Sequence, residues 1–306
     1  MNGIYRGMIH MCLKHLLVMG YLLSLGLFCS SCTKNKLAEN ITKTNSVCET
    51  VKTSVEWKYC FSPGSVPKAG KLIYYFHGGD GSETDWVDPN NYSEGLRQSW
   101  KKTKPEIPSV VSISFGKMWL LADRSSATKS GLYDVVKNEI IPFVEKNILK
   151  FPVQERILLG ESMGGFNAGT FALRNLDLFS KLALICPSLG SNNKDLSHDV
   201  DGYIKETGAD PKYAKNLIKI RDEYFPSWES AYAQSPLTLI KNIPSKKSYP
   251  KIFISCGDQD QYGFFKSSAD FVKLATEKGF NTIWKPVSGG KHCSLDVEAL
   301  STFLIQ

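Results

Sequence analysis

A glycine-flanked serine is the residue whose setting best fits covalent chemistry in this chain of 306 residues. Ser162 lies in segment 160–164, which reads Gly-Glu-Ser-Met-Gly and matches the pattern G-x-S-x-G. The pattern alone is weak, because a chain with 24 glycines can contain it by chance. Its position strengthens it, since a strand-like run at 156–159 precedes it and a helix-like run at 163–174 follows it. A sharp turn between a strand and a helix exposes a serine hydroxyl, so Ser162 is the predicted nucleophile.

A serine hydroxyl needs a base near neutral pH, and histidine is the usual one. After residue 31 the chain contains His77, His198 and His292. His77 precedes the serine in a glycine-rich loop, and His198 lies in a polar stretch typical of a surface. The order serine, acid, histidine requires a histidine late in the chain. His292, which follows the last expected strand, is therefore the predicted base.

The base in turn needs a carboxylate that fixes its tautomer and stabilises its charged form. Asp258 and Asp260 both follow the expected strand at 251–256. Spacing alone does not choose between carboxylates two positions apart, so both are candidates. The aspartate that is not the acid is expected to be a turn residue.

Two backbone N–H groups could stabilise the oxyanion that forms when a serine attacks a carbonyl. One is expected from Met163, which follows the nucleophile at the start of a helix. The other is expected from Gly79, in the His-Gly-Gly-Asp-Gly loop after the expected strand at 71–76. This loop lacks the G-x-x-x-x-G-K-[ST] pattern of a phosphate-binding loop. The sequence has no metal, nucleotide or flavin signature, so no cofactor is expected.

Strands and helices are expected to alternate around these residues. Apolar runs predict strands at 53–61, 71–76, 110–115, 156–159, 182–186, 251–256 and 281–286. Helices are expected at 133–148, 163–174, 264–278 and 294–305, and Pro142 should kink the first. This alternation predicts a mostly parallel sheet with helices on both faces. The segment 188–248, after the strand that ends near Cys186, has no clear strand and predicts a helical insert, or lid.

The N-terminal segment 1–31 predicts a signal peptide, because basic residues precede an apolar run at 16–28 that is short for a membrane span. The Ser-Ser-Cys that follows resembles a bacterial lipobox, and the resemblance makes Cys32 the lipid-bearing first residue of the mature chain. Plain secretion and an uncleaved anchor are the alternatives. Residues 32–50 are the expected tether and 51–306 the expected domain. The chain is thus expected to be exported and lipid-anchored to a bacterial membrane, on its periplasmic or extracellular side.

Charge and cysteine content limit the expected partners. The formal net charge is +7, but the basic residues are scattered, so nucleic-acid binding is not expected. No CxxC motif or Cys/His spacing of a zinc site occurs. Cys48 and Cys60 could form a disulfide in an oxidising compartment, or remain as buried thiols. The lipid anchor is the expected membrane contact, and the sequence does not indicate an oligomeric state.

Five stretches resemble the Putative esterase family of α/β hydrolases, which includes esterase D-like S-formylglutathione hydrolases, feruloyl and acetyl esterases, siderophore esterases and mycolyltransferases. The stretches are 72–79, 139–145, 160–165, 256–260 and 289–292. The resemblance implies the α/β-hydrolase fold from about residue 53 to the C-terminus. It also implies Asp260 as the acid, because the family acid stands three residues after a glycine that ends a strand. Lys291 and Cys293 depart from the family pattern, in which glycine and an acidic residue commonly flank the histidine.

The expected function is that of a serine carboxylic-ester hydrolase that works through an acyl-enzyme. Export favours acetyl or feruloyl-type esters of saccharides, so the expected partner is a small-molecule or oligosaccharide ester. The insert at 188–248 varies among family members and is expected to line the acyl pocket. The alternatives are an acyltransferase to a sugar, a serine peptidase, or a non-catalytic binding protein with the same fold.

Overall fold

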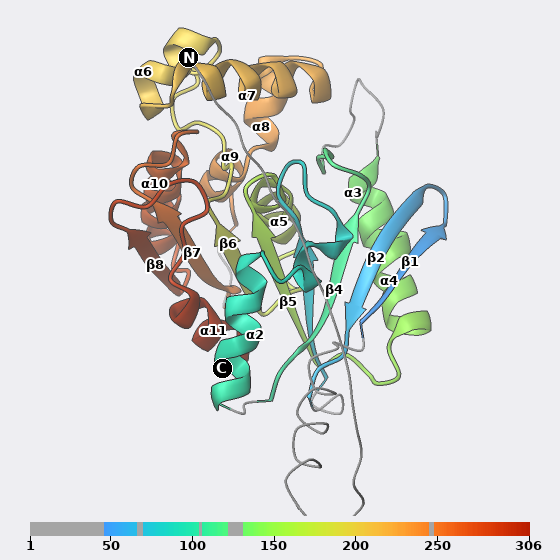
Figure 1. Ribbon diagram of the computed structural model, residues 1–306. Coiled ribbons are helices and arrows are strands. Elements are labelled where there is room, and N and C mark those ends of the chain that lie inside the picture. The colour runs from blue at the N-terminus through green and yellow to red at the C-terminus, as the bar shows by residue number, and fades with distance from the viewer. Residues whose placement is uncertain (1–45, 66–69, 104–105, 122–130, 245–247) are drawn as a thin grey trace, which may run out of the picture. The chain divides into compact units, whose positions relative to one another are not determined.

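The computed structural model describes residues 46–65, 70–103, 106–121, 131–244 and 248–306. Eight strands within these residues form one sheet in the order β1-β2-β4-β3-β5-β6-β7-β8 (Figure 1). They are β1 (Val47–Lys52), β2 (Glu56–Ser62), β3 (Lys71–Phe76), β4 (Ser109–Ser114), β5 (Glu155–Glu161), β6 (Lys181–Ile185), β7 (Lys251–Gly257) and β8 (Thr282–Val287). β2 pairs antiparallel with β1 and β4, and every other neighbouring pair is parallel.

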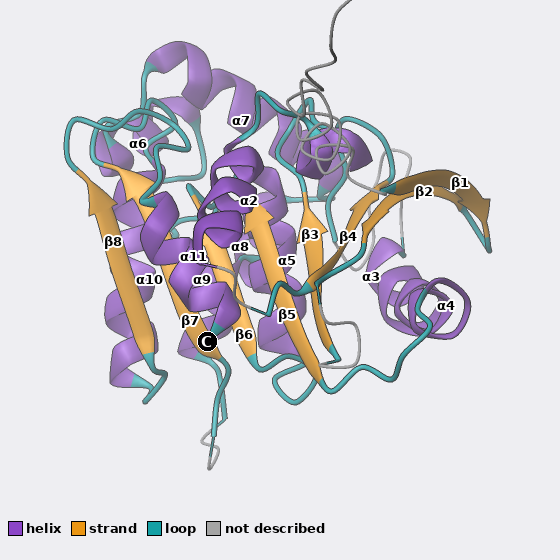
Figure 2. Ribbon diagram, turned by 60° about the horizontal axis from the view of Figure 1, so that its bottom comes forward, coloured by secondary structure: helices purple, strands orange, loops and turns teal. Residues whose placement is uncertain are grey.

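Helices cover both faces of the sheet (Figure 2). One face packs against α2 (Tyr92–Thr103) and α11 (Val297–Ile305). The other packs against α5 (Met163–Arg174), against α10 (Phe264–Glu277) and against the helical segment 132–148. This architecture confirms the predicted α/β-hydrolase fold.

The apolar run of β3 is continuous because both of its faces are buried. Leu72, Tyr74 and Phe76 belong to the core beneath α5, whereas Ile73 and Tyr75 belong to the core beneath α2 and α11. Side chains of a strand alternate between faces, so a strand covered on both sides needs apolar residues at every position. The strand predicted at 71–76 is confirmed with the same bounds.

The kinked helix predicted at 133–148 is continuous but uneven. It consists of α3 (Leu132–Val135), a π-helical turn (Val136–Ile140), α4 (Ile141–Phe143) and a second π-helical turn (Val144–Ile148). Pro142 has no N–H to donate to the preceding turn. Wider turns lie on both sides of it, as is common where a helix absorbs a local irregularity.

The predicted insert is helical and consists of α6 (Val200–Thr207), α7 (Pro211–Tyr224), α8 (Trp228–Gln234) and α9 (Pro236–Lys241). Each helix begins after a side chain that accepts a hydrogen bond from a backbone N–H of its first turn. The capping residues are Asp199, Asp210, Ser227 and Ser235. Such caps satisfy N–H groups that have no partner within the helix, so the sequence of the insert itself determines where its helices begin.

The N-terminal edge of the sheet differs from the prediction. The strand expected at 53–61 is present as β2, but another strand, β1, precedes it and begins at Val47, before the expected domain start at residue 51. β1 is mostly exposed and lacks the alternating apolar pattern that indicates a strand. A disulfide joins Cys48 of β1 to Cys60 of β2, which is the first of the two alternatives for this pair. The helix α2 was not predicted either.

The predicted signal peptide, the predicted lipid attachment at Cys32 and residues 32–45 of the predicted tether lie outside the described residues. In the part of the chain that the structure describes, no helix has the length and apolar character needed to cross a membrane.

We predict that the double substitution Cys48→Ser/Cys60→Ser lowers the free energy of unfolding by roughly 2–3 kcal/mol, because the bridge restricts the unfolded chain. Urea denaturation measures the effect. Thr50→Ala in the same exposed strand is the control and should change this free energy by less than about 0.5 kcal/mol. A double variant as stable as the unmodified protein would contradict the prediction.

Candidate active site

Ser162 occupies a strained turn between β5 and α5, with a backbone φ of 50°. This left-handed region is unfavourable for a residue with a side chain. Neighbouring segments approach the turn so closely that two flanking positions admit no side chain. A Cβ atom on Gly164 would overlap the carbonyl of Phe76, and one on Gly160 would overlap the carbonyl of Gly164. The glycines of the G-x-S-x-G pattern are therefore steric requirements of the turn.

Ser162, His292 and Asp260 form a hydrogen-bonded chain. The Oγ atom of Ser162 lies 3.0 Å from Nε2 of His292, and Nδ1 of the same ring lies 2.6 Å from Oδ2 of Asp260. A carboxylate accepts a hydrogen bond from Nδ1–H of the imidazole. Nε2 is then unprotonated and can take the proton of the serine hydroxyl. The structure thus brings together the three residues that the sequence predicted as nucleophile, base and acid.

The two candidate acids have different environments. The side chain of Asp260 is fully buried, and its Oδ1 accepts the backbone N–H groups of Tyr262 (2.9 Å) and Phe264 (3.4 Å). Asp258 is exposed and accepts the N–H of Gly289 (2.8 Å). Asp258 therefore fastens the turn that precedes the histidine, as expected of a turn residue, whereas Asp260 contacts the imidazole itself.

A disulfide lies directly beside the imidazole. Cys186 follows β6, Cys293 follows His292, and the two sulfurs are bonded. Sγ of Cys186 is 3.9 Å from Nε2 of His292, and the ring of Tyr262 covers the imidazole at 4.4 Å between centroids. The bridge therefore ties the histidine loop to the central sheet. The sequence did not predict this pair, because five cysteines follow Cys32 and their spacing does not select partners.

The loop after β3 is fixed from several sides. The indole N–H of Trp119 lies 3.1 Å from Nε2 of His77, and an indole can only donate. Nε2 is therefore the unprotonated nitrogen, and Nδ1–H donates to the carbonyl of Gly78 at 2.7 Å. His77 is completely buried, so it is a structural residue of this loop and not a second base. His198 is on the surface and pairs with Asp199 at 3.0 Å.

The two predicted oxyanion donors come from segments that meet at the nucleophile. Met163 is the first residue of α5, and Gly79 belongs to the loop after β3. β3 and β5 are paired with Phe76 opposite Gly160, so the segments that follow both strands emerge side by side. Gly79, Met163 and Ser162 all line one cavity.

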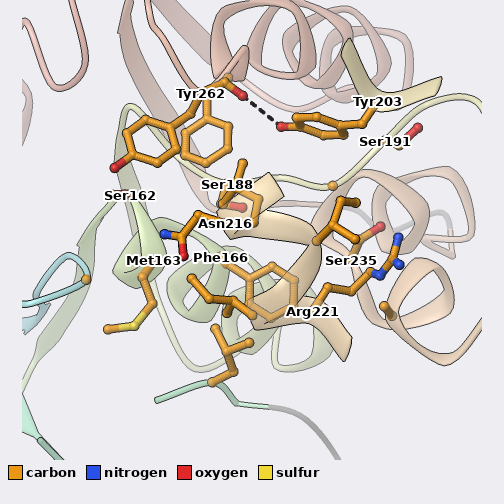
Figure 3. A pocket seen from close by; sticks show the side chains of 18 of the residues that line it. Ser162, Met163, Phe166, Ser188, Ser191, Tyr203, Asn216, Arg221, Ser235 and Tyr262 are labelled. Atoms are coloured by element: carbon orange, nitrogen blue, oxygen red, sulfur yellow. Dashed lines mark hydrogen bonds between the residues drawn. The ribbon is translucent and has the colours of Figure 1, made fainter. Parts of the chain in front are cut away.

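This cavity has a volume of about 320 Å³ and extends from Ser162 beneath the helical insert (Figure 3). Phe166 of α5 and Phe225, Trp228 and Tyr232 of the insert contribute aromatic walls. Polar groups lie among them, including Arg221, whose guanidinium donates to the carbonyl of His198 and stacks over Trp228. The cavity therefore fits an organic group with a large apolar part.

Two buried acidic groups near the site have shifted pKa values. Burial raises the pKa of Glu161 to about 7, while the N–H of Gly78 and the hydroxyl of Tyr75 lower it and the charge of Asp85 raises it. Burial, together with the charge of Asp260, raises the pKa of the Cys256 thiol well above its usual range. Cys256 therefore stays protonated and unreactive near neutral pH. The sulfur atoms of Cys186 and Cys293 also lie near His292, but their mutual bond makes them unsuitable as metal ligands.

The geometry suits attack by a serine on an electrophilic carbon. His292 can take the proton of Ser162, Asp260 can stabilise the resulting imidazolium, and Gly79 and Met163, the two predicted oxyanion donors, line the same cavity.

Comparisons with known proteins agree with this arrangement. The chain matches the family described as "Putative esterase" over residues 61–286. A comparison with curated proteins finds no significant match. Among solved structures, a ferulic acid esterase is 15% identical with a TM-score of 0.60, over 85% of this chain and 94% of the other. Carboxyl esterase 2 from Tuber melanosporum is 16% identical with a TM-score of 0.61, over 86% of each chain. An S-formylglutathione hydrolase from Staphylococcus aureus is 16% identical with a TM-score of 0.57, over 85% of this chain and 98% of the other.

We predict that Asp260→Asn slows phosphonylation of Ser162 by a fluorophosphonate by about two to four orders of magnitude, because an amide cannot stabilise the imidazolium. Asp258→Asn is the matched control. Its amide oxygen can still accept the N–H of Gly289, so labelling should stay within about threefold of the unmodified protein. Labelling rates measured by mass spectrometry test both variants, and the opposite ranking would reassign the acid.

Proposed function

The chain belongs to the Putative esterase family of carboxylic-ester hydrolases, and from this premise we propose that it cleaves its substrate through an acyl-enzyme formed on Ser162. The observation that carries the proposal is the continuous chain of hydrogen bonds from Ser162 through His292 to Asp260. A serine with such partners becomes a nucleophile at neutral pH.

The reaction has two halves. In the first, Oγ of Ser162 bonds to the ester carbonyl carbon, and its proton passes to Nε2 of His292. The carbonyl oxygen becomes an oxyanion that accepts the N–H groups of Met163 and Gly79. His292 then gives its proton to the departing alcohol, which leaves the acyl group on Ser162. In the second half, water loses a proton to His292 and bonds to the acyl carbon. The bond from this carbon to Oγ of Ser162 then breaks, His292 returns its proton to Oγ, and the carboxylic acid leaves.

We propose that the substrate is an acetyl or feruloyl-type ester of a saccharide. Of these two, the size and aromatic lining of the cavity favour the feruloyl-type acyl group, which is the larger one. Aromatic side chains bury large areas and favour stacking with a planar ring. A structure similar to this chain is named a ferulic acid esterase, but at 15% identity it shares only the fold.

We propose that the enzyme is exported and held at a bacterial membrane by a lipid on Cys32. The sequence of the first 32 residues supports this location. The two disulfides of the described residues add support, because such bonds persist mainly in oxidising compartments.

We predict that the protein without residues 1–31 hydrolyses p-nitrophenyl acetate, p-nitrophenyl butyrate and methyl ferulate, with the highest kcat/KM on the ester whose acyl group best fills the cavity. Ser162→Ala should lose at least about three orders of magnitude on every ester, because no other described residue offers an activated nucleophile. Initial rates at matched protein concentration test this. Equal rates for both proteins would show that the hydrolysis is not due to this site.

We predict that Cys32→Ser abolishes incorporation of radioactive palmitate when the full chain is expressed in a bacterium, because the serine offers no thiol for a thioether-linked lipid. The protein should then move from the membrane fraction to the soluble fraction. Cys29→Ser is the matched control and should remain labelled. Label that persists in Cys32→Ser would contradict the lipid anchor.

A further inference from the structure

Glu161 immediately precedes the nucleophile and has no part in the reaction as derived above. It is the last residue of β5, and its Oε1 accepts the N–H of Gly78 at 3.2 Å. The contact links the end of β5 to the loop that follows β3. Both segments line the cavity in which the ester carbonyl would lie.

Gly78 is held at both of its backbone polar groups, because Glu161 binds its N–H and other groups bind its carbonyl. The carbonyl of Gly78 accepts Nδ1–H of His77 at 2.7 Å and the N–H of Gly81 at 3.2 Å. This carbonyl shares a planar trans peptide unit with the N–H of Gly79, so the two groups point in opposite directions. Because Glu161 fixes the N–H of Gly78 and His77 fixes its carbonyl, the direction of the Gly79 N–H follows.

The surroundings of Glu161 offer no opposite charge. The titratable groups that face it are Tyr75 of β3, Tyr92 of α2, and Asp85 of the 3-10 helix Glu83–Val87. The Tyr75 and Tyr92 hydroxyls are buried, and that of Tyr75 lies close enough to the carboxylate to lower the pKa of Glu161. Among the described residues, no basic side chain forms an ion pair with Glu161.

A carboxylate at the position of Glu161 does not stabilise the folded protein. Its ionised form is desolvated and has no basic partner among the described residues, which opposes folding. Its raised pKa of about 7 agrees with that cost. Residues that oppose folding concentrate at functional sites, where their geometry is needed.

We propose that Glu161 is a positioning residue that holds the loop 77–81 so that the Gly79 N–H points at the developing oxyanion. This role rests on the proposed function, since it serves the acyl-transfer step on Ser162. The carboxylate acts through its acceptor oxygen and touches no reacting atom.

The test compares Glu161→Ala with Glu161→Gln in the ester assay. Glu161→Ala removes the acceptor, so kcat should fall by about 10- to 100-fold while KM changes by less than about threefold, because the oxyanion exists only in the transition state. Glu161→Gln keeps an oxygen that can accept the Gly78 N–H, so it should restore most of kcat. It should also remove from the pH profile of kcat the ionisation of Glu161 near pH 7.

Tyr92→Phe is the matched control, because it alters the same buried cluster and leaves both the Gly78 contact and the Tyr75 hydroxyl in place. It should leave kcat unchanged. Hydrogen exchange of a peptide that covers residues 77–81 gives a readout independent of activity, and it should accelerate in Glu161→Ala but not in Glu161→Gln or Tyr92→Phe.

The possible outcomes separate the two proposals. If the unmodified protein exceeds Ser162→Ala on esters but Glu161→Ala equals the unmodified protein, the positioning role is wrong and the proposed function stands. The role is also wrong if hydrogen exchange of the loop does not change, or if Glu161→Gln fails as severely as Glu161→Ala. If the unmodified protein does not exceed Ser162→Ala, the proposed function itself is wrong.

Discussion

The close approach of the backbone at the strand-to-helix turn is the constraint on which the rest of the site depends. Ser162 can adopt its strained conformation only because the positions of Gly160 and Gly164 carry no side chains. The same close approach brings α5 against the end of β3, so the loop that contains Gly79 lies next to the nucleophile. A larger residue at either glycine would therefore separate the serine from its oxyanion donor as well as distort the turn.

The order of the strands in the sheet brings the acid and the base next to this turn. Ser162 follows β5, Asp260 follows β7 and His292 follows β8. Parallel strands present their carboxyl ends at the same edge, which is where ligands bind in sheets of this kind. Residues separated by up to 130 positions thereby lie within hydrogen-bond distance. The helical insert, which follows β6, lines the cavity at this same edge.

Much of this could be predicted from sequence, since the strongest signals are local. The turn that contains Ser162 combines the G-x-S-x-G pattern with a strand before it and a helix after it. The buried strands show continuous apolar runs. Asp260 could be chosen over Asp258 only through the family resemblance, because the distinction depends on which carboxylate reaches the imidazole. β1 escaped prediction since an exposed edge strand needs no apolar pattern. The Cys186–Cys293 bridge and the contact of Glu161 with Gly78 could not be predicted, because each joins segments that only the fold brings together.

The Cys186–Cys293 bridge also closes a covalent ring around part of the enzyme. The two cysteines are 107 positions apart, and the segment between them contains the whole insert, β7, the acid and β8. A peptide bond cut anywhere in that segment would leave two fragments that the disulfide still holds together. The nucleophile and the histidine would remain parts of one molecule. For an enzyme proposed to work outside the cytoplasm, the insert can therefore be nicked by a protease without release of the catalytic histidine.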